Sequence, residues 1–167
     1  MTTNTERADL IESLTAHRGF LLFTVQGVTD EQARRRTTVS ELTLGGLIKH
    51  VAHTERGWAD FIEQGTAAVE ATEDSWTAQA ESFTLRPDET LAGVLADYAE
   101  VAKRTDALVE SLPSLDLAHP LPEAPWFPAG AAWSARRVFA HIVGETAQHA
   151  GHADILREAL DGQKTMG

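Results

Sequence analysis

Three histidines and one glutamate lie at helical spacing near the end of the chain: His141, Glu145, His149 and His152. At about 100° per residue on an α-helix, these four side chains fall within about 80° of one another. The apolar residues of the same segment fall on the same side, so the polar groups lie within the stripe that packs into a core. An unpaired polar group is costly there. Either a metal ion or a buried hydrogen-bond network would satisfy them.

Glu145 and His149 are one helical turn apart, so their side chains can converge on one ion. Imidazole nitrogens combined with a carboxylate suit Zn²⁺, Ni²⁺, Fe²⁺ or Mn²⁺, and three protein ligands leave a position for water or substrate. His141, one turn before Glu145, and His152, almost one turn after His149, are then alternative ligands or partners that orient the ligands.

Long amphipathic helices must position these residues. Apolar periodicity predicts such helices over residues 6–26, 42–64, 88–112 and 134–161. Ser134 is the expected N-cap of the last helix, and Gly162 its expected end. On the second helix, His50 lies at the flank of the apolar stripe and can face the core, whereas His53 is expected to face water. His119, in the last connection, is also expected at the surface.

Two long connections complete the predicted organisation. Residues 65–87 are expected to cross over the bundle with a short helical piece around residues 75–82. Residues 113–132 contain most of the prolines and predict an ordered loop, and no strand is expected anywhere. The pattern predicts an all-α four-helix bundle that forms a single domain over residues 1–167.

Composition limits the functional classes. The formal net charge of −11 argues against a nucleic-acid partner. No apolar stretch is long enough to cross a membrane and no secretory signal is recognisable, so a cytoplasmic location is the expectation. With zero cysteines, the chain has no thiolate ligand and no nucleophilic thiol of its own. Any metal must therefore be held by His, Asp or Glu.

The segment LIKHVAHTERGW around His50, followed far downstream by ExxxHxGHxDILRExxDG, resembles the DinB/YfiT-like superfamily, with likeness to an actinobacterial branch over nearly the whole chain. The resemblance implies a four-helix bundle with a long crossover between the second and third helices. It also implies a divalent metal held by His50, Glu145 and His149. The ExxxH pair is similar to that of mycothiol-dependent maleylpyruvate isomerases. His152 stands outside this three-ligand pattern. As our own hypothesis, His141 or His152 orients the ligands or carries a proton.

The same resemblance implies an activity. Characterised relatives are S-transferases or isomerases that use a low-molecular-weight thiol such as mycothiol or bacillithiol. The expectation is a metal-dependent thiol S-transferase or isomerase of detoxification or stress metabolism, in which the metal activates the thiol of the cofactor towards a small electrophile. Zinc is the first metal to consider. A homodimer is compatible with the resemblance. The alternatives are a non-catalytic metal- or ligand-binding stress protein and a metal-dependent hydrolase.

Overall fold

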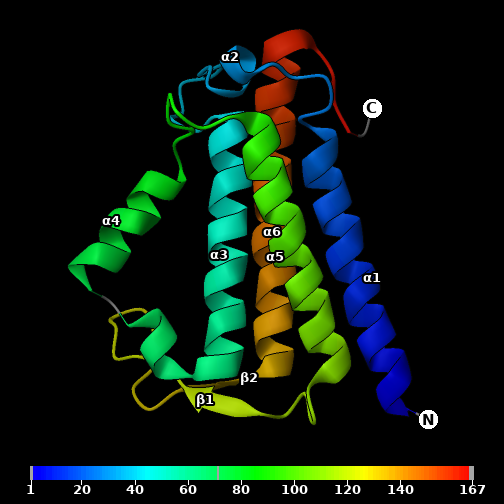
Figure 1. Cartoon of the computed structure of the whole chain (residues 1–167), viewed down its shortest axis with the longest axis vertical. Coiled ribbons are helices and arrows are strands. Elements are labelled where there is room, and N and C mark those ends of the chain that lie inside the picture. Colours follow the sequence, from blue (N-terminus) through cyan, green and yellow to red (C-terminus); the bar gives the residue numbers. More distant parts are fainter. Residues whose placement is uncertain (1, 71, 166–167) are drawn as a thin grey trace.

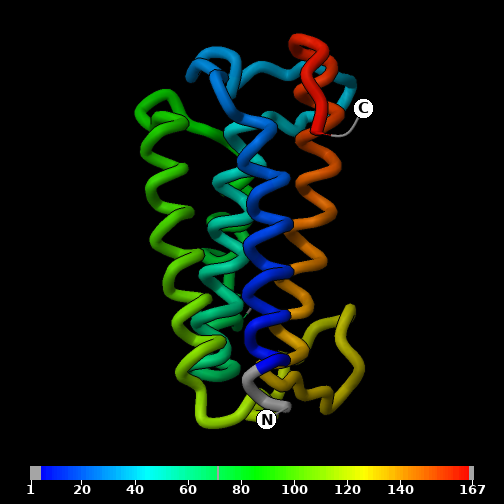
Figure 2. Tube along the Cα trace, turned by 90° about the vertical axis from the view of Figure 1, so that its right-hand side faces the viewer, coloured from blue at the N-terminus to red at the C-terminus, as the bar shows by residue number. Residues whose placement is uncertain are grey.

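The structure, a computed structural model, describes residues 2–70 and 72–165 and is a bundle of four long helices (Figure 1, Figure 2). These helices are α1 (Thr2–Phe23), α3 (Leu44–Gln64), α5 (Leu91–Ser111) and α6 (Ala135–Asp161). Helix α3 packs against both α5 and α6, and α1 packs mainly against α6. The predicted all-α four-helix bundle is confirmed. Within the described residues, no helix is both long enough and apolar enough to span a membrane.

Side-chain caps determine where three of the long helices begin. Thr43, Thr90 and Ser134 stand at N-cap positions, and each side-chain oxygen accepts a hydrogen bond from the backbone N–H three residues later. Gly162 ends α6 in the left-handed conformation, with φ at +82°, which side chains other than glycine rarely adopt. Both predicted ends of the last helix are confirmed, while Thr90 delays the start of α5 beyond the predicted residue 88.

The crossover between α3 and α5 carries a short 3₁₀ helix, η1 (Thr66–Val69), and the helix α4 (Glu73–Ser82). Helix α4 leans away from the bundle at its start and returns towards α3 at its end (Figure 1). Gly46 permits this return, because a Cβ atom at that position would lie 1.9 Å from the carbonyl oxygen of Phe83. The helix begins slightly earlier than predicted, because Thr72 caps its first turn.

The second long connection contains a pair of strands that the sequence analysis did not expect. Strand β1 (Ala118–Pro120) pairs antiparallel with β2 (Ala132–Ser134). Strands of three residues are too short to show an alternating pattern, and their pairing depends on a partner distant in sequence. His119 is also not a free surface residue. It is half-buried, with Nε2 3.1 Å from the carbonyl oxygen of Ile62 at the end of α3.

The interior combines large apolar side chains with a buried ion pair. Tyr98 and Phe61 are among the largest side chains that are almost fully buried. Arg18 donates to the carboxylate of Glu55 at 2.5 Å and to that of Asp106 at 2.8 Å. Arg18 and Glu55 are both buried, so the pair links α1 to α3 where water does not weaken it.

Candidate metal centre

Three potential metal ligands from two helices meet inside the bundle. His50 comes from α3, and Glu145 and His149 come from successive turns of α6. One ligand atom of each, a ring nitrogen or a carboxylate oxygen, lies within 4.8 Å of the other two. Among the described residues, no other group of three or more His, Asp or Glu side chains has this geometry. The structure therefore brings together the residues that the sequence analysis proposed as ligands, called the triad below.

The members of the triad face one another at distances that leave room for an ion. Glu145 Oε2 lies 3.6 Å from His149 Nε2, which is longer than a normal hydrogen bond. The rings of His50 and His149 meet edge-on, with 4.8 Å between their centroids. Both histidines are buried, and Glu145 is half-buried. Two imidazoles and one carboxylate in this arrangement fit a divalent cation that keeps a further coordination position.

The orientation of His50 is set by the end of α4. The hydroxyl of Ser82 donates its proton to the carbonyl oxygen of Gln79 at 2.6 Å. It must therefore accept from the Nδ1–H of His50, 2.9 Å away, so Nε2 of His50 carries no proton. Phe83 stacks on the imidazole, with 3.7 Å between ring centroids and 18° between ring planes. A histidine that donates its outer N–H to a neighbour is typical of a metal ligand.

The electrostatic environment favours the protonation states that a metal site needs. Burial lowers the pKa of His50 to about 4, and the nearby His149 contributes in the same direction. The neighbouring His149 ring is the largest influence that lowers the pKa of Glu145, and His141 adds to it. At neutral pH, His50 is therefore neutral and Glu145 is a carboxylate. Ligands must be deprotonated in this way before they can bind a metal.

The two other histidines of α6 flank the triad on opposite sides. His141 Nε2 lies 3.7 Å from the second carboxylate oxygen of Glu145, and burial lowers the pKa of His141. His152 Nδ1 lies 3.4 Å from His149 Nδ1, on the side of the ring that faces away from Glu145. Each of these histidines therefore contacts one member of the triad.

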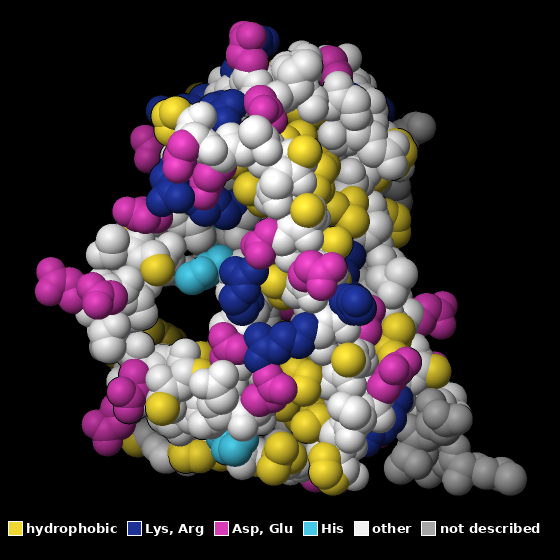
Figure 3. All heavy atoms as spheres, in the orientation of Figure 1, with side chains coloured by type: hydrophobic (Ala, Val, Ile, Leu, Met, Phe, Trp, Pro, Cys, Tyr) yellow, Lys and Arg dark blue, Asp and Glu magenta, His cyan; other side chains and the backbone are white. Residues whose placement is uncertain are grey.

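A cleft of about 470 Å³ gives access to the triad, and His50 and Glu145 form part of its lining. Its walls come from α3, α4, α6 and the loop between the strands, residues 121–131. Figure 3 shows the open gap between α4 and the bundle, with a histidine at its edge. His53 lines this cleft and is half-buried, so its side chain lies at the opening between α3 and α4.

Several residues around the site were not identified from the sequence. Ser82 and Phe83 contact His50 only because the crossover returns to α3. Helical periodicity does not predict a contact between His50 and these two residues. Trp76 and Trp126 line the cleft from α4 and from the loop between the strands. Their exposure is a tertiary property that helical periodicity does not report.

Comparisons with known proteins support this description. A comparison with curated proteins finds no significant match. A family model described as mycothiol S-transferase matches residues 9–162, which include the triad and its two flanking histidines. Because the match covers almost the whole chain, this protein belongs to the mycothiol S-transferase family, within the DinB/YfiT-like superfamily.

Proposed function

We propose that this protein is a divalent-metal-dependent S-transferase that joins mycothiol, or a similar low-molecular-weight thiol, to a small electrophile. The observation that carries the proposal is the convergence of His50, Glu145 and His149, of which His50 and Glu145 line an open cleft. The family match supports the thiol and the transferase class. Zinc is the first metal to test, with nickel, iron and manganese as alternatives, because two imidazoles and a carboxylate suit all four.

In this proposal, His50, Glu145 and His149 hold the metal. A divalent ion at this position would act as a Lewis acid that lowers the pKa of a bound thiol, so that a thiolate forms at neutral pH. The chain contains no cysteine, so the nucleophilic sulfur has to come from the cofactor. Ser82 keeps the proton of His50 on Nδ1 and leaves Nε2 available to the centre.

In this proposal, both reactants bind beside the candidate metal centre. The sulfur lone pair forms a carbon–sulfur bond, and the leaving group departs with the electron pair of the bond that breaks. The thiol proton leaves before this step, and His141 and His152 are the candidates to carry it or to orient the ligands. Holding both reactants in one cleft removes much of the entropic cost of their encounter.

The first experiment measures metal content by mass spectrometry in protein purified without an affinity tag. We expect about one metal ion per chain in the wild type, and content near background in His149→Ala and Glu145→Ala, because each removes one of three ligands. His17→Ala is the matched control, since His17 belongs to α1 and contacts Ser13 and Phe20. Its metal content should equal that of the wild type.

The metal-loaded protein is then supplied with mycothiol and a panel of electrophiles, and thiol consumption is measured with and without a chelator. Consumption that the chelator abolishes supports the proposal. Absence of metal after incubation with zinc, nickel and ferrous iron contradicts the metal site. Absence of thiol consumption by the loaded protein contradicts the transferase assignment, and ester hydrolysis in its place favours a hydrolase.

A further inference from the structure

Two tryptophans touch each other at the rim of the cleft although both are exposed. Trp76, on α4, is 51% exposed, and Trp126, in the loop between the strands, is 57% exposed. Their rings meet edge-to-face, with 5.5 Å between centroids and 87° between planes. Large aromatic groups gathered at a concave surface are typical of ligand sites, because leaving them in water is unfavourable.

This aromatic surface continues inward to the triad. Trp126 contacts Phe127, and Phe127 contacts Trp133, with centroid distances of 6.1 Å and 5.8 Å. Trp133 stacks on Trp58 at 4.9 Å, and both rings lie 5.0 Å from His141, which is the neighbour of Glu145. Together with Trp76, these side chains link the rim of the cleft to the candidate metal centre.

The cleft is chemically asymmetric. Four of its lining side chains form what we call the aromatic wall: Trp58, Trp76, Trp126 and Phe127. Four others form the polar wall: His53, Thr54, Arg56 and Gln79. A second hollow of about 560 Å³ shares His53 and Arg56 with the cleft and also contains Lys49, so it continues from the polar wall. Val69 and Pro122 line the same cleft, as do the carboxylates of Asp60 and Glu70.

We propose that the aromatic wall binds the apolar, ring-bearing part of the electrophile, and that the polar wall and the second hollow receive the thiol cofactor. This inference rests on the proposed function and names the substrate class. Sugar hydroxyls and amides need hydrogen-bond partners. The second hollow offers donors and acceptors in the ion pairs Lys49–Glu89 and Arg56–Asp97, and His53 stands beside them. The rings of Trp76, Trp126 and Phe127 offer few such partners but complement a hydrocarbon ring, which gains from aromatic stacking.

The first test measures binding without chemistry. The metal-loaded protein is titrated calorimetrically with N-(1-naphthyl)acetamide, which contains the ring but no leaving group. We expect Trp76→Ala and Trp126→Ala each to weaken binding about tenfold, because each removes a stacking surface. Phe20→Ala is the matched control, since Phe20 is an aromatic residue of α1 that is 45% exposed. Equal affinity in the wild type and both tryptophan variants would overturn the inference.

The second test compares two electrophiles that share one reactive carbon, iodoacetamide and N-(1-naphthyl)iodoacetamide, with mycothiol as the thiol. In Trp126→Ala, we expect kcat/KM for the naphthyl compound, relative to iodoacetamide, to fall about tenfold. The KM for mycothiol in Trp126→Ala should equal that of the wild type. A rise in the KM for mycothiol with an unchanged ratio would place the thiol on the aromatic wall and overturn the inference.

The two proposals fail in different ways. If the wild type consumes no mycothiol, the transferase assignment fails, and the calorimetric titration still decides whether the aromatic wall binds a ring. If mycothiol is consumed but the ratio of kcat/KM for the two electrophiles is the same in the tryptophan variants as in the wild type, the transferase assignment stands and the inference fails. Far-ultraviolet circular dichroism of each variant confirms that the bundle has folded.

Discussion

Single side chains outside the triad determine how it presents its nitrogens. His50 has two ring nitrogens, and only one of them can face the centre without a proton. Ser82 selects that state, because its own proton is already committed to the carbonyl oxygen of Gln79. A partner of this kind raises the basicity of the ligand and restricts its rotation.

Replacing Ser82 with alanine should therefore weaken zinc binding about ten- to a hundredfold. The substitution removes the acceptor for the Nδ1–H of His50 and leaves that buried donor unpaired. The affinity is measured by competition with a chromophoric chelator. Ser82→Thr, which keeps the hydroxyl, should recover most of it, and Ser111→Ala at the end of α5 is the control. Equal zinc affinity in Ser82→Ala and the wild type would contradict the role assigned to Ser82.

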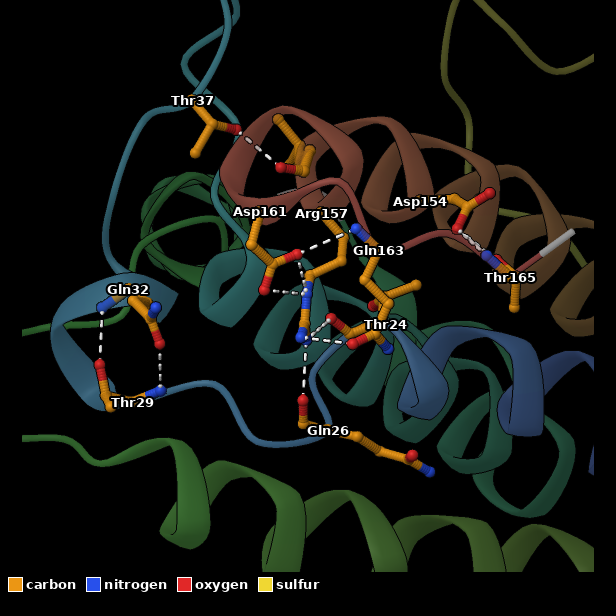
Figure 4. Close-up of polar contacts among 11 residues, drawn as sticks. Thr24, Gln26, Thr29, Gln32, Thr37, Asp154, Arg157, Asp161, Gln163 and Thr165 are labelled. Atoms are coloured by element: carbon orange, nitrogen blue, oxygen red, sulfur yellow. Dashed lines mark hydrogen bonds and ion pairs between the residues drawn. The ribbon is translucent and has the colours of Figure 1, made fainter. Parts of the chain in front are cut away.

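At the scale of elements, the end of α6 is held to the end of α1 by one buried arginine. Nη1 of Arg157 donates to the carbonyl oxygens of Thr24 at 2.9 Å and Gln26 at 2.8 Å, as Figure 4 shows. Its Nε donates to Asp161 and its Nη2 to Gln163. The segment after α1 keeps tighter turn hydrogen bonds through its N–H groups, and the guanidinium supplies donors for the carbonyl oxygens of Thr24 and Gln26.

Substituting Arg157 with methionine should lower the free energy of unfolding by about 2–4 kcal/mol, because it leaves carbonyl groups without donors in a buried position. Urea denaturation followed by circular dichroism measures the change. Arg35→Met is the matched control, since Arg35 pairs with Glu31 at an exposed position and such pairs contribute at most about 1 kcal/mol. A loss in Arg157→Met no larger than that of the control would refute the role of this arginine.

At the scale of the whole molecule, the stability of the bundle depends on how it accommodates polar groups in its core. The buried charges of Arg18 and Glu55 neutralise each other in an ion pair. The hydroxyl of Tyr98, in contrast, is buried without a hydrogen-bond partner among the described residues. Burial raises the pKa of Tyr98 well above its ordinary value, and Glu55 adds to this while Arg18 partly opposes it. Tyr98 is the single tyrosine of the chain, so its effect can be isolated.

Because folding raises this pKa, the contribution of Tyr98 is fully present below pH about 10, the pKa of an unfolded tyrosine, and is lost as the pH rises further. We expect Tyr98→Phe to change the free energy of unfolding by less than about 1 kcal/mol at pH 7. Above pH about 10, the wild type should lose stability more steeply than the variant. Urea titrations at several pH values test this, and parallel curves for the two proteins would contradict it.

Much of the architecture and the triad could be predicted from the sequence, because both depend on local regularities. The one-turn spacing of Glu145 and His149, the cap at Ser134 and the glycine at position 162 involve neighbours along one helix. Helical periodicity determines which side chains share a face, and this does not depend on which element packs against that face. The grouping of His50 with the α6 pair required one further step, the resemblance to a known family, and the structure brings the three side chains together.

The tertiary structure alone decided how the site is completed. Ser82 and Phe83 meet His50 from a crossover whose path follows from Gly46, and the strand pair and the Trp76–Trp126 contact join segments far apart in sequence. His119 lies against the end of α3 and His53 lines the cleft, and helical periodicity predicts neither placement. Closing long loops costs conformational entropy, and such contacts form only when packing in the assembled bundle offsets that cost. No short segment of the chain contains the residues on both sides of these contacts.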